Sequence, residues 1–434
     1  MLWIASLSLF LIPLQLGECR PPLSPRQTTP SLHERVGLDE ASQDNTLAKV
    51  YGVAMKNANQ FGNIPIPTGF PEWISAKGTQ YVNKDKGDWT AGFFPGTLWL
   101  LYQRATTLKQ TQKVNSTKLK YLAEAWTVNL ESNKGRTDTH DLGFMMHDTF
   151  GWKAKLTNDA QARDVVIESA KSLARRFNPT VGAIRSWGSL TDNNNFNVII
   201  DNMMNLDMLY WASQQTSNKT LADIATTHAL TTIKNHFRAD GSTYHVLNYN
   251  PRTGALLSRG TNQGYSDSST WSRGQAWAIH GYIATYKHTK DVRFLDIALK
   301  AVNYFLSKLP ADGVPYWDFN APLPGPRDTS AGMIVASGLL QLYALDRARF
   351  VKEKDAAVKL IEDTLKLSSP PRSDFGVVNG QWVVKKLGYE GLLMNGTIDN
   401  NPGKTKTERS ANTGLVYAGY YLVEAQNWIL QLGL

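Results

Sequence analysis

Residues 329–346, TSAGMIVASGLLQLYALD, decide the fold because they form the longest stretch that is apolar on nearly every side. The segment is longer than an ordinary strand and contains no Pro, Lys or Arg, so it predicts a helix buried all round. Residues 92–107, which include FFPGTLWLLYQ, have the same character. These segments predict a protein in which some helices form an inner layer.

Other segments predict helices with one buried face. Residues 114–131 place Leu119, Leu122, Trp126 and Leu130 at spacings of three and four, and residues 159–176 and 351–367 are amphipathic in the same way. Apolar and amphipathic segments alternate along much of the chain, which indicates helical hairpins closed into a ring. The fold class predicted is all-α, an (α/α)6 barrel with a few short strands in its loops. The helices are expected at 46–59, 92–107, 114–131, 141–155, 159–176, 197–215, 219–237, 272–288, 291–307, 329–346, 351–367 and 410–427, and short strands at 181–187, 242–249 and 376–385.

The composition indicates which classes of molecule the protein is expected to bind. The net charge of +9 suits an anionic substrate, although a solvated basic surface explains the charge equally well. The basic residues are scattered, with no run of five and no nucleic-acid-binding module, so we expect no nucleic-acid partner. The 13 Trp, 17 Tyr and 15 Phe often stand beside Gly, Asp, Asn or Arg, as in clefts where rings stack on sugars. Core packing accounts for most aromatic residues in any protein.

The N-terminus predicts export. Residues 1–19, MLWIASLSLFLIPLQLGEC, read as a secretory signal that is too short to span a bilayer, so we expect a secreted, extracellular protein with no membrane partner. Residues 20–44 contain four prolines among polar residues and are expected to be a disordered lead-in. Residues 45–434 are then the barrel domain. The only cysteine, Cys19, leaves with the signal, which excludes a disulfide scaffold. The chain also has three N-glycosylation sequons, at Asn115, Asn218 and Asn395, and no feature that calls for an obligate protein partner.

Polar residues interrupt the apolar pattern where inner helices begin, and the N-terminal ends of such helices share one rim. Trp89 lies in the loop before residues 92–107 and is free to form a platform for a sugar. Asp141 lies in DTHDLGF, with His147 and Asp148 just beyond. This spacing matches no zinc signature, so we predict neither a metal nor another cofactor. Taken alone, Asp141 is at least as well explained as a helix N-cap.

Asp201 is set in an apolar run, residues 197–206, with Asn202 and Asn205 beside it. Apolar surroundings raise the pKa of a carboxyl, which is what a general acid near neutral pH requires. A structural polar network with the two asparagines is the alternative. Arg273 is expected on the first turn of a helix capped by Thr270 or Ser272, where a cation is unfavourable. A bound carboxylate would explain it through a bidentate contact, and a salt bridge to Asp267 is the alternative.

Four motifs, in this order and spacing, carry a resemblance. They are WTAGFFPGTLW (89–99), HDLGF (140–144), IIDNMMNLDMLYWA (199–212) and SDSSTWSRGQAWA (266–278). Together they resemble the unsaturated glucuronyl hydrolases, glycoside hydrolase family 88, from about residue 45 to the C-terminus. The resemblance implies an (α/α)6 barrel with Asp201 as general acid/base and Asp141 as the second essential carboxylate. It also implies a subsite lined by Trp89, His140, Trp187, His245, Gln263, Arg273 and Trp277. Ser410 is the nearest candidate for the segment that contacts the substrate carboxylate.

The resemblance implies removal of a 4,5-unsaturated uronic acid from the non-reducing end of oligosaccharides released by polysaccharide lyases. Such a sugar contains a vinyl ether, so the expected reaction is hydration initiated by protonation at C4. An unsaturated rhamnogalacturonyl hydrolase is the nearest alternative. A polysaccharide lyase on a similar toroid and a non-catalytic carbohydrate-binding protein are the others.

Overall fold

The structure is a computed structural model that describes residues 30–60 and 66–434, of which residues 32–434 form one compact unit. The helices are α1 (Leu32–Arg35), α2 (Glu40–Gln60), α3 (Phe93–Thr106), α4 (Ser116–Val128), η1 (Asn129–Asn133), η2 (Gly143–Gly151), α5 (Trp152–Thr157), α6 (Ala160–Ala174), η3 (Ile200–Asn205), α7 (Leu206–Thr216), α8 (Lys219–His236), α9 (Ser272–Thr289), α10 (Val292–Ser307), α11 (Thr329–Leu345), α12 (Val351–Ser368) and α13 (Val416–Leu432). Of these, η1 and η3 are 3₁₀ helices and η2 is a π-helix. No helix in the described part of the chain has the length and apolar character needed to cross a membrane.

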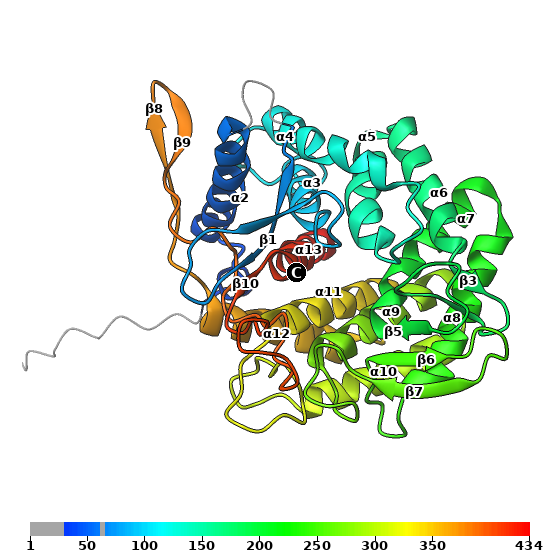
Figure 1. Cartoon of the computed structure of the whole chain (residues 1–434). Coiled ribbons are helices and arrows are strands. Elements are labelled where there is room, and N and C mark those ends of the chain that lie inside the picture. The colour runs from blue at the N-terminus through cyan, green and yellow to red at the C-terminus, as the bar shows by residue number, and fades with distance from the viewer. Residues whose placement is uncertain (1–29, 61–65) are drawn as a thin grey trace, which may run out of the picture. The chain divides into compact units, whose positions relative to one another are not determined.

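The helices form two concentric layers. The inner layer contains α3, η2–α5, η3–α7, α9, α11 and α13, in which each member packs on the next and α13 returns to α3. Figure 1 shows α13, in red, between α3 and α11. The outer layer contains α2, α4, α6, α8, α10 and α12, each adjacent in sequence to inner members. This strict alternation confirms the predicted (α/α)6 barrel.

The burial of individual helices follows the sequence pattern. Every residue of α11 from Thr329 to Leu342 is buried, as expected of an inner helix. In α12, by contrast, the buried residues are confined to Ala357, Leu360, Ile361, Thr364 and Ser368, a single stripe with helical spacing. The predicted inner positions of 92–107 and 329–346 and the outer positions of 114–131, 159–176 and 351–367 are therefore confirmed.

The strands are short and antiparallel, and they lie in the connections between helices. They are β1 (Gly69–Ile74), β2 (Val82–Asp85), β3 (Phe177–Asn178), β4 (Ala183–Ile184), β5 (Phe196–Ile199), β6 (Val246–Tyr249), β7 (Leu256–Gly260), β8 (Asp374–Val378), β9 (Gln381–Lys386) and β10 (Gly414–Leu415). They pair in the orders β10-β1-β2, β3-β4, β5-β6-β7 and β8-β9. The register Ile199↔Val246 matters most for function, because it brings the residues that follow β5 next to those that precede β6.

Two predictions of local structure are wrong in part. Residues 197–215 are not one helix: they begin in strand β5 and continue through η3 before α7, because pairing with β6 decides the conformation of an apolar run that suits either structure. The expected lead-in, 20–44, is helical at Leu32–Arg35 and from Glu40 onward. Val36 and Leu38 between these helices are buried, and Gln426 Nε2 donates to Val36 O at 2.9 Å, so tertiary packing orders a segment of polar composition. The predicted signal, residues 1–19, lies outside the described residues.

Candidate functional site

The candidate catalytic residues lie at the N-terminal ends of inner helices. Asp141 stands just before η2, Asp201 is in the first turn of η3, and Arg273 is in the first turn of α9. Inner helices in an alternating barrel all run in the same direction, so these ends belong to one rim of the ring. The π-helical turn of η2 directly after Asp141 is a feature that often accompanies functional sites.

Asp201 is a buried carboxyl without a structural role of its own. Its side chain is 12% exposed, and Oδ1 has no hydrogen-bond partner among the described residues. Burial raises its pKa to about 7; Asp141 adds to the rise, while His140 and Arg273 oppose it. Asp201 is therefore largely protonated below neutral pH and able to donate a proton.

The two asparagines beside Asp201 form the polar network that the sequence left open as an alternative. Asn205 Oδ1 accepts from Gly143 N at 2.8 Å, and Asn205 Nδ2 donates to Asn202 Oδ1 at 3.3 Å. Asn202 Nδ2 in turn donates to Ile184 O at 3.2 Å. None of these bonds involves the Asp201 carboxyl, so the network ties η2 to η3 and leaves Asp201 free.

Asp141 is held as a carboxylate. Burial alone would raise its pKa, but His140, Thr139 and Arg176 together lower it below its ordinary value. His140 Nε2 lies 3.1 Å from Asp141 Oδ1, and Thr139 Oγ1 donates to Oδ2 at 2.8 Å. The N-cap of η2 is Leu142, without a side-chain cap, so Asp141 is not a helix cap. The site thus pairs an ionised carboxylate with one whose pKa is near 7.

His245 lies directly beside Asp201. The backbone bond from Ile200 N to His245 O, 3.1 Å, continues the β5–β6 pairing and leaves His245 Nε2 3.8 Å from Asp201 Oδ1. Burial and the nearby Arg273 lower the pKa of His245 well below its ordinary value. Asn262 N donates to His245 Nδ1 at 3.3 Å, which makes Nδ1 an acceptor and leaves the ring proton on Nε2, facing Asp201.

Arg273 differs from both expectations. Its guanidinium is fully buried and pairs with Asp328 at 2.6 Å, not with Asp267. Nη1 also donates to Thr397 O at 2.6 Å and Nη2 to Ile398 O at 2.7 Å, while Nε has no partner among the described residues. Neither Thr270 nor Ser272 caps α9, whose N-cap is Trp271 without a side-chain cap. Arg273 therefore anchors the 397–398 backbone, and its buried Nε is the one nitrogen of the guanidinium without a partner among the described residues.

The predicted aromatic residues surround this rim. Trp89 packs against Phe144 and Tyr417, with ring centroids 5.6 and 5.2 Å apart. Trp277 is fully buried, packs on Phe144 at 5.0 Å, and has an indole N–H without a partner among the described residues. Trp187 is partly exposed and lines a cavity of about 360 Å³ together with Asn262. Thr261 and Asn262, which both contact His245 Nδ1, also line this cavity.

The two remaining predicted residues lie in loops at the same rim. Gln263 is partly exposed and follows Asn262, whose carbonyl accepts from Asn401 Nδ2 at 3.1 Å. Ser410 exchanges backbone hydrogen bonds with Asp399 and Ile398, at 2.8 Å each, in the segment that Arg273 anchors. The structure therefore brings the Ser410 segment and the loop of Gln263 together, although no side-chain contact of either residue supports a role.

Four contributors were missed in the sequence. Trp271 stacks its ring 4.4 Å from that of His245, and Tyr417 lies 5.2 Å from the Arg273 guanidinium with its hydroxyl unpartnered among the described residues. Asp328 forms the ion pair with Arg273, and the charge of Arg176 lowers the pKa of Asp141. Trp271 was visible within SDSSTWSRGQAWA. The other three lie far along the chain from their partners, and no local pattern marks them.

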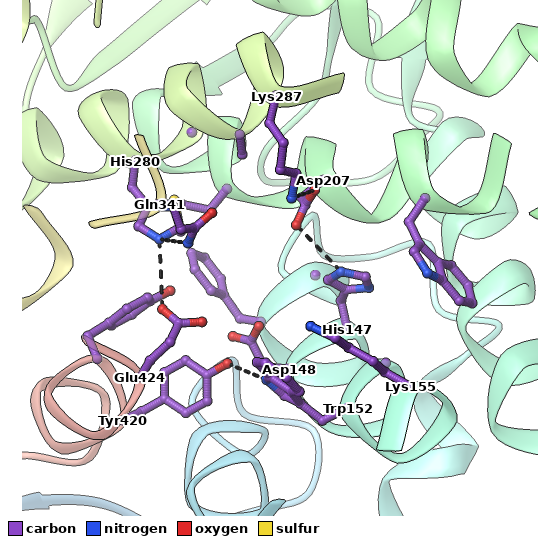
Figure 2. Close-up of a pocket in the computed structure, with 18 of the residues that line it drawn as sticks. His147, Asp148, Trp152, Lys155, Asp207, His280, Lys287, Gln341, Tyr420 and Glu424 are labelled. Carbon is purple, nitrogen blue, oxygen red and sulfur yellow. Dashed lines mark hydrogen bonds and ion pairs between the residues drawn. The ribbon is translucent and has the colours of Figure 1, made fainter. Parts of the chain in front are cut away.

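A second cavity, of about 400 Å³, lies inside the ring and is lined by residues of η2, α5, η3, α7, α9, α11 and α13. Figure 2 shows Asp148, Glu424, His280 and Lys155 around it. It shares Phe144 and Tyr421 with the aromatic layer described below but contains neither Asp141 nor Asp201. Across residues 30–60 and 66–434, no group of three or more His, Cys, Asp and Glu side chains is placed to hold a metal ion.

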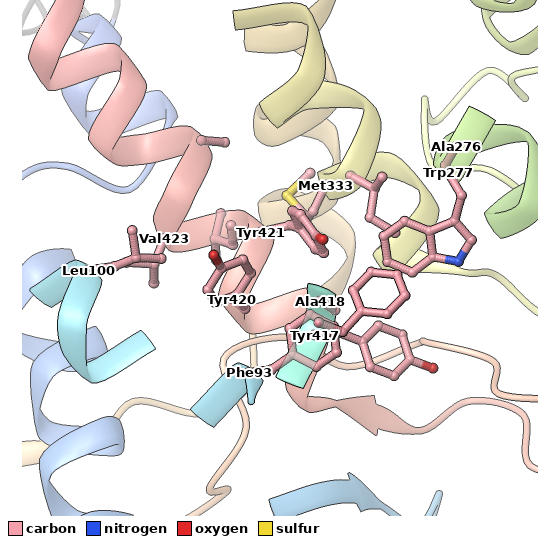
Figure 3. Close-up of a cluster of buried hydrophobic side chains, with 14 of the residues drawn as sticks. Phe93, Leu100, Ala276, Trp277, Met333, Tyr417, Ala418, Tyr420, Tyr421 and Val423 are labelled. Carbon is pink, nitrogen blue, oxygen red and sulfur yellow. The ribbon is translucent and has the colours of Figure 1, made fainter. Parts of the chain in front are cut away.

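A layer of aromatic rings separates the two ends of the barrel. Phe144 packs on Trp277 at 5.0 Å and on Phe93 at 5.6 Å, and Trp277 packs on Tyr421 at 5.5 Å. Phe93 also meets Tyr417 at 5.7 Å. Figure 3 shows Phe93, Trp277 and Tyr421 of this layer, which come from three different inner helices. The catalytic rim and the second cavity are therefore distinct sites.

The chain is similar to known proteins over most of its length. It is 36% identical over 399 residues to the unsaturated glucuronyl hydrolase of Formosa agariphila, which covers 90% of this chain and 93% of that protein. The crystal structure of an unsaturated glucuronyl hydrolase specific for heparin has a TM-score of 0.75 at 31% identity, covering 92% of this chain and 98% of the other. A structure of UGL with dGlcA-Glc-Rha-Glc has a TM-score of 0.75 at 27% identity, covering 88% and 95%. No protein-family model matches the chain.

Proposed function

The chain belongs to the unsaturated glucuronyl hydrolases, and from this premise we propose that Asp201 and Asp141 hydrate a 4,5-unsaturated uronic acid at the non-reducing end of lyase-generated oligosaccharides. The observation that carries the assignment is the contrast between the two carboxyls. Asp201 is buried, with a pKa of about 7 and an unpartnered Oδ1, whereas Asp141 stays ionised on the same rim. An acid and a fixed negative charge are what protonation of a vinyl ether requires.

The proposed reaction begins with transfer of the Asp201 proton to C4 of the sugar. The electron pair of the C4–C5 double bond forms the new C–H bond, and positive charge develops at C5 and the ring oxygen. The Asp141 carboxylate stabilises this charge electrostatically. Water then adds to C5 and gives its proton to the Asp201 carboxylate, which restores the acid. The hemiketal opens and releases the aglycone, so the sum is the addition of one water molecule.

The surrounding residues fit this role in position. His245 directs its Nε2 toward Asp201, and its neighbour Trp271 closes one side. The uronate carboxylate is proposed to meet the free edge of Arg273 and the backbone near Ser410. Trp187 and Asn262 line the adjoining cavity and are proposed to receive the sugar that becomes the leaving group.

The test is an absorbance assay, because hydration destroys the ultraviolet absorbance of the vinyl ether. The wild type is expected to abolish this absorbance on defined lyase products of the glucuronate type, and Asp201→Asn to lose at least a thousandfold in kcat. An Asp296→Asn variant, at an exposed position of the outer helix α10, serves as the control. Activity confined to galacturonate-type products, or full activity in Asp201→Asn, would overturn the proposal. Absorbance that grows on intact polymer would indicate a lyase instead.

A further inference from the structure

The second cavity, inside the ring, has no part in the reaction above. Its volume of about 400 Å³ lies within the range of small-molecule sites. Side chains from η2, α5, α7, α9, α11 and α13 all reach it, and Figure 2 shows them directed toward a common centre. The aromatic layer separates it from Asp201, so ligand binding in this cavity does not depend on the proposed function.

The walls of this cavity combine flat aromatic faces with planar polar groups. Trp152, Trp211 and Trp428 line it and are each partly exposed, which leaves ring surface available. On the other side, Gln341 Nε2 lies 3.0 Å from His280 Nε2, while His280 Nδ1 is buried without a partner among the described residues. Rings facing polar side chains suit a pyranose, whose C–H face stacks while its hydroxyls form hydrogen bonds.

The carboxyl groups in the cavity are already neutralised or satisfied. Asp207 is paired with Lys287 at 3.0 Å and with His288. Burial alone would raise its pKa, but Lys287, His147 and His288 hold it well below the ordinary value. Burial and the nearby Glu424 raise the pKa of Asp148 well above its usual range, which favours its neutral form. Glu424 Oε2 accepts from Ser337 Oγ at 2.5 Å and lies 3.8 Å from His280 Nε2. Asp207 and Glu424 therefore both have partners in the wall of the cavity.

Lys155 is the exception, because its charge is not paired. Its Nζ lies 4.5 Å from the centre of the Trp152 ring, and it forms no ion pair with the described residues. Burial and the ammonium group of Lys287 lower its pKa, while the carboxylates of Glu424 and Asp207 act in the opposite direction. An anion bound beside Lys155 would give this ammonium the close partner that it lacks among the described residues.

We propose that this cavity is a second binding site, for an acidic saccharide of one or two residues, with its carboxylate beside Lys155 and Lys287 and its ring on Trp152 or Trp211. The hydroxyls of the sugar then meet Gln341, His280 and the carboxyl groups. The site lies among side chains of the helices that carry the catalytic residues at their other ends, and it binds its ligand without reacting with it.

The test uses the full chain and sodium D-glucuronate, which lacks the vinyl ether and is not hydrated. Calorimetric titration is expected to show binding that weakens at least tenfold in Lys155→Met and in Trp211→Leu. The matched control is Lys153→Met, because Lys153 lies on the same helix and pairs with Asp159 at 3.0 Å, away from the cavity. Glucose is expected to bind at least tenfold more weakly than glucuronate.

Three further outcomes decide the matter. Asp201→Asn is expected to keep the Lys155-dependent binding, so failure of the catalytic assignment leaves this measurement intact. A second measurement needs no variant. The indole N–H of Trp152 donates to the Tyr420 hydroxyl at 3.0 Å, and its NMR resonance in the wild type is expected to shift as glucuronate is added. Glucuronate binding that is absent, unchanged in both cavity variants, or matched by glucose would overturn the proposal.

Discussion

At the scale of single residues, the site depends on two aspartates whose surroundings differ. Asp201 is buried, burial raises its pKa, and the His245 ring 3.8 Å away has a pKa well below its ordinary value. The pKa of Asp141 is lowered by His140, by the hydroxyl of Thr139 and by the more distant Arg176. The same side chain therefore carries a proton in one place and a charge in the other, as in other enzymes that separate acid and base roles by environment.

The pH dependence of activity follows from the raised pKa of Asp201 and the lowered pKa of Asp141. Because Asp201 acts in its protonated form and burial sets its pKa at about 7, kcat/KM is expected to fall tenfold per pH unit above about pH 7. The pKa of Asp141 is lowered, so the acidic limb lies below the ordinary range of a carboxyl. Initial rates between pH 3 and 10 on one lyase product check this. A rate that rises steadily from pH 7 to pH 9 would contradict the assignment of Asp201 as the acid.

Arg176 is a buried cation that acts on Asp141 from a distance. Its Nε donates to Arg185 O at 2.9 Å and its Nη2 to Ser186 O at 3.1 Å, while Nη1 donates to Thr137 O. It therefore joins the backbone before Trp187 to the loop that carries Asp141.

Replacement of Arg176 by Met is expected to lower kcat/KM at least tenfold and to move the acidic limb of the pH profile upward, since the pKa of Asp141 loses a lowering contribution. The exposed neighbour Arg175, as Arg175→Met, is the matched control. A loss of activity with an unmoved acidic limb would mean that Arg176 has a structural role alone.

At the scale of elements, close packing between inner helices positions η3. A Cβ added at Gly281 of α9 would lie 2.6 Å from Met203 Cβ and 2.8 Å from Met203 C and O in η3. Backbone atoms of η3 cannot move without moving Asp201, two residues earlier. The same argument applies where η2 meets η3, since a Cβ at Gly143 would lie 2.5 Å from Asn205 Oδ1.

Gly281→Ala is accordingly expected to destabilise the protein by about 1–3 kcal/mol and to reduce kcat, because overpacking displaces η3. Gly135→Ala is the control, since nothing lies within 4 Å of the added Cβ, and it is expected to change stability by less than about 0.5 kcal/mol. Urea denaturation and the absorbance assay measure both effects. Equal stability of the two variants would show that α9 and η3 are free to separate.

The sequence predicts some elements closely and others poorly, for physical reasons. Residues 291–307 were expected to be a helix and α10 spans Val292–Ser307, because its apolar spacing is regular and Asp291 caps it by accepting from Arg293 N. Strand β5 and η3 were hidden, since an apolar run such as 196–200 carries no period that separates strand from helix. Pairing with β6, almost fifty residues later, decides the conformation.

The site shows the same division. Asp141 and Asp201 stand in distinctive local motifs, and the structure places both at one rim as expected. The partner of Arg273 was not predictable, because Asp328 lies 55 residues further along and reaches it only through the closure of α9 on α11. The catalytic and substrate-binding roles of the predicted residues remain predictions, to be tested by the variants described.

At the scale of the whole molecule, we propose that the protein is secreted, on the basis of the signal-like residues 1–19. The three N-glycosylation sequons then differ in how accessible they are to the glycosylating enzyme. Asn115 and Asn218 are exposed N-caps at the starts of α4 and α8, on the outer layer. Asn395, by contrast, donates through Nδ2 to Ser368 Oγ at 3.0 Å, and Thr397 of its sequon is fully buried.

When the chain is produced through a eukaryotic secretory pathway, glycans are expected at Asn115 and Asn218 and not at Asn395. Peptide mass spectrometry with and without glycosidase measures the occupancy of each site. The variants Asn115→Gln and Asn218→Gln are expected to lose one glycan each, whereas Asn395→Gln leaves the mass of the glycans unchanged. A high occupancy at Asn395 would show that its segment opens before the barrel closes.

The packing of α13 against both α3 and α11 has a consequence for the order of synthesis. A ribosome delivers the other eleven helices of the two layers before residues 416–432 emerge, and until then the ring has an open seam between α3 and α11. Tyr417 and Tyr421, which complete the aromatic layer, arrive in that last segment. A nascent chain therefore exposes two long apolar edges until residues 416–432 have been made, and only then can the ring close around the catalytic rim.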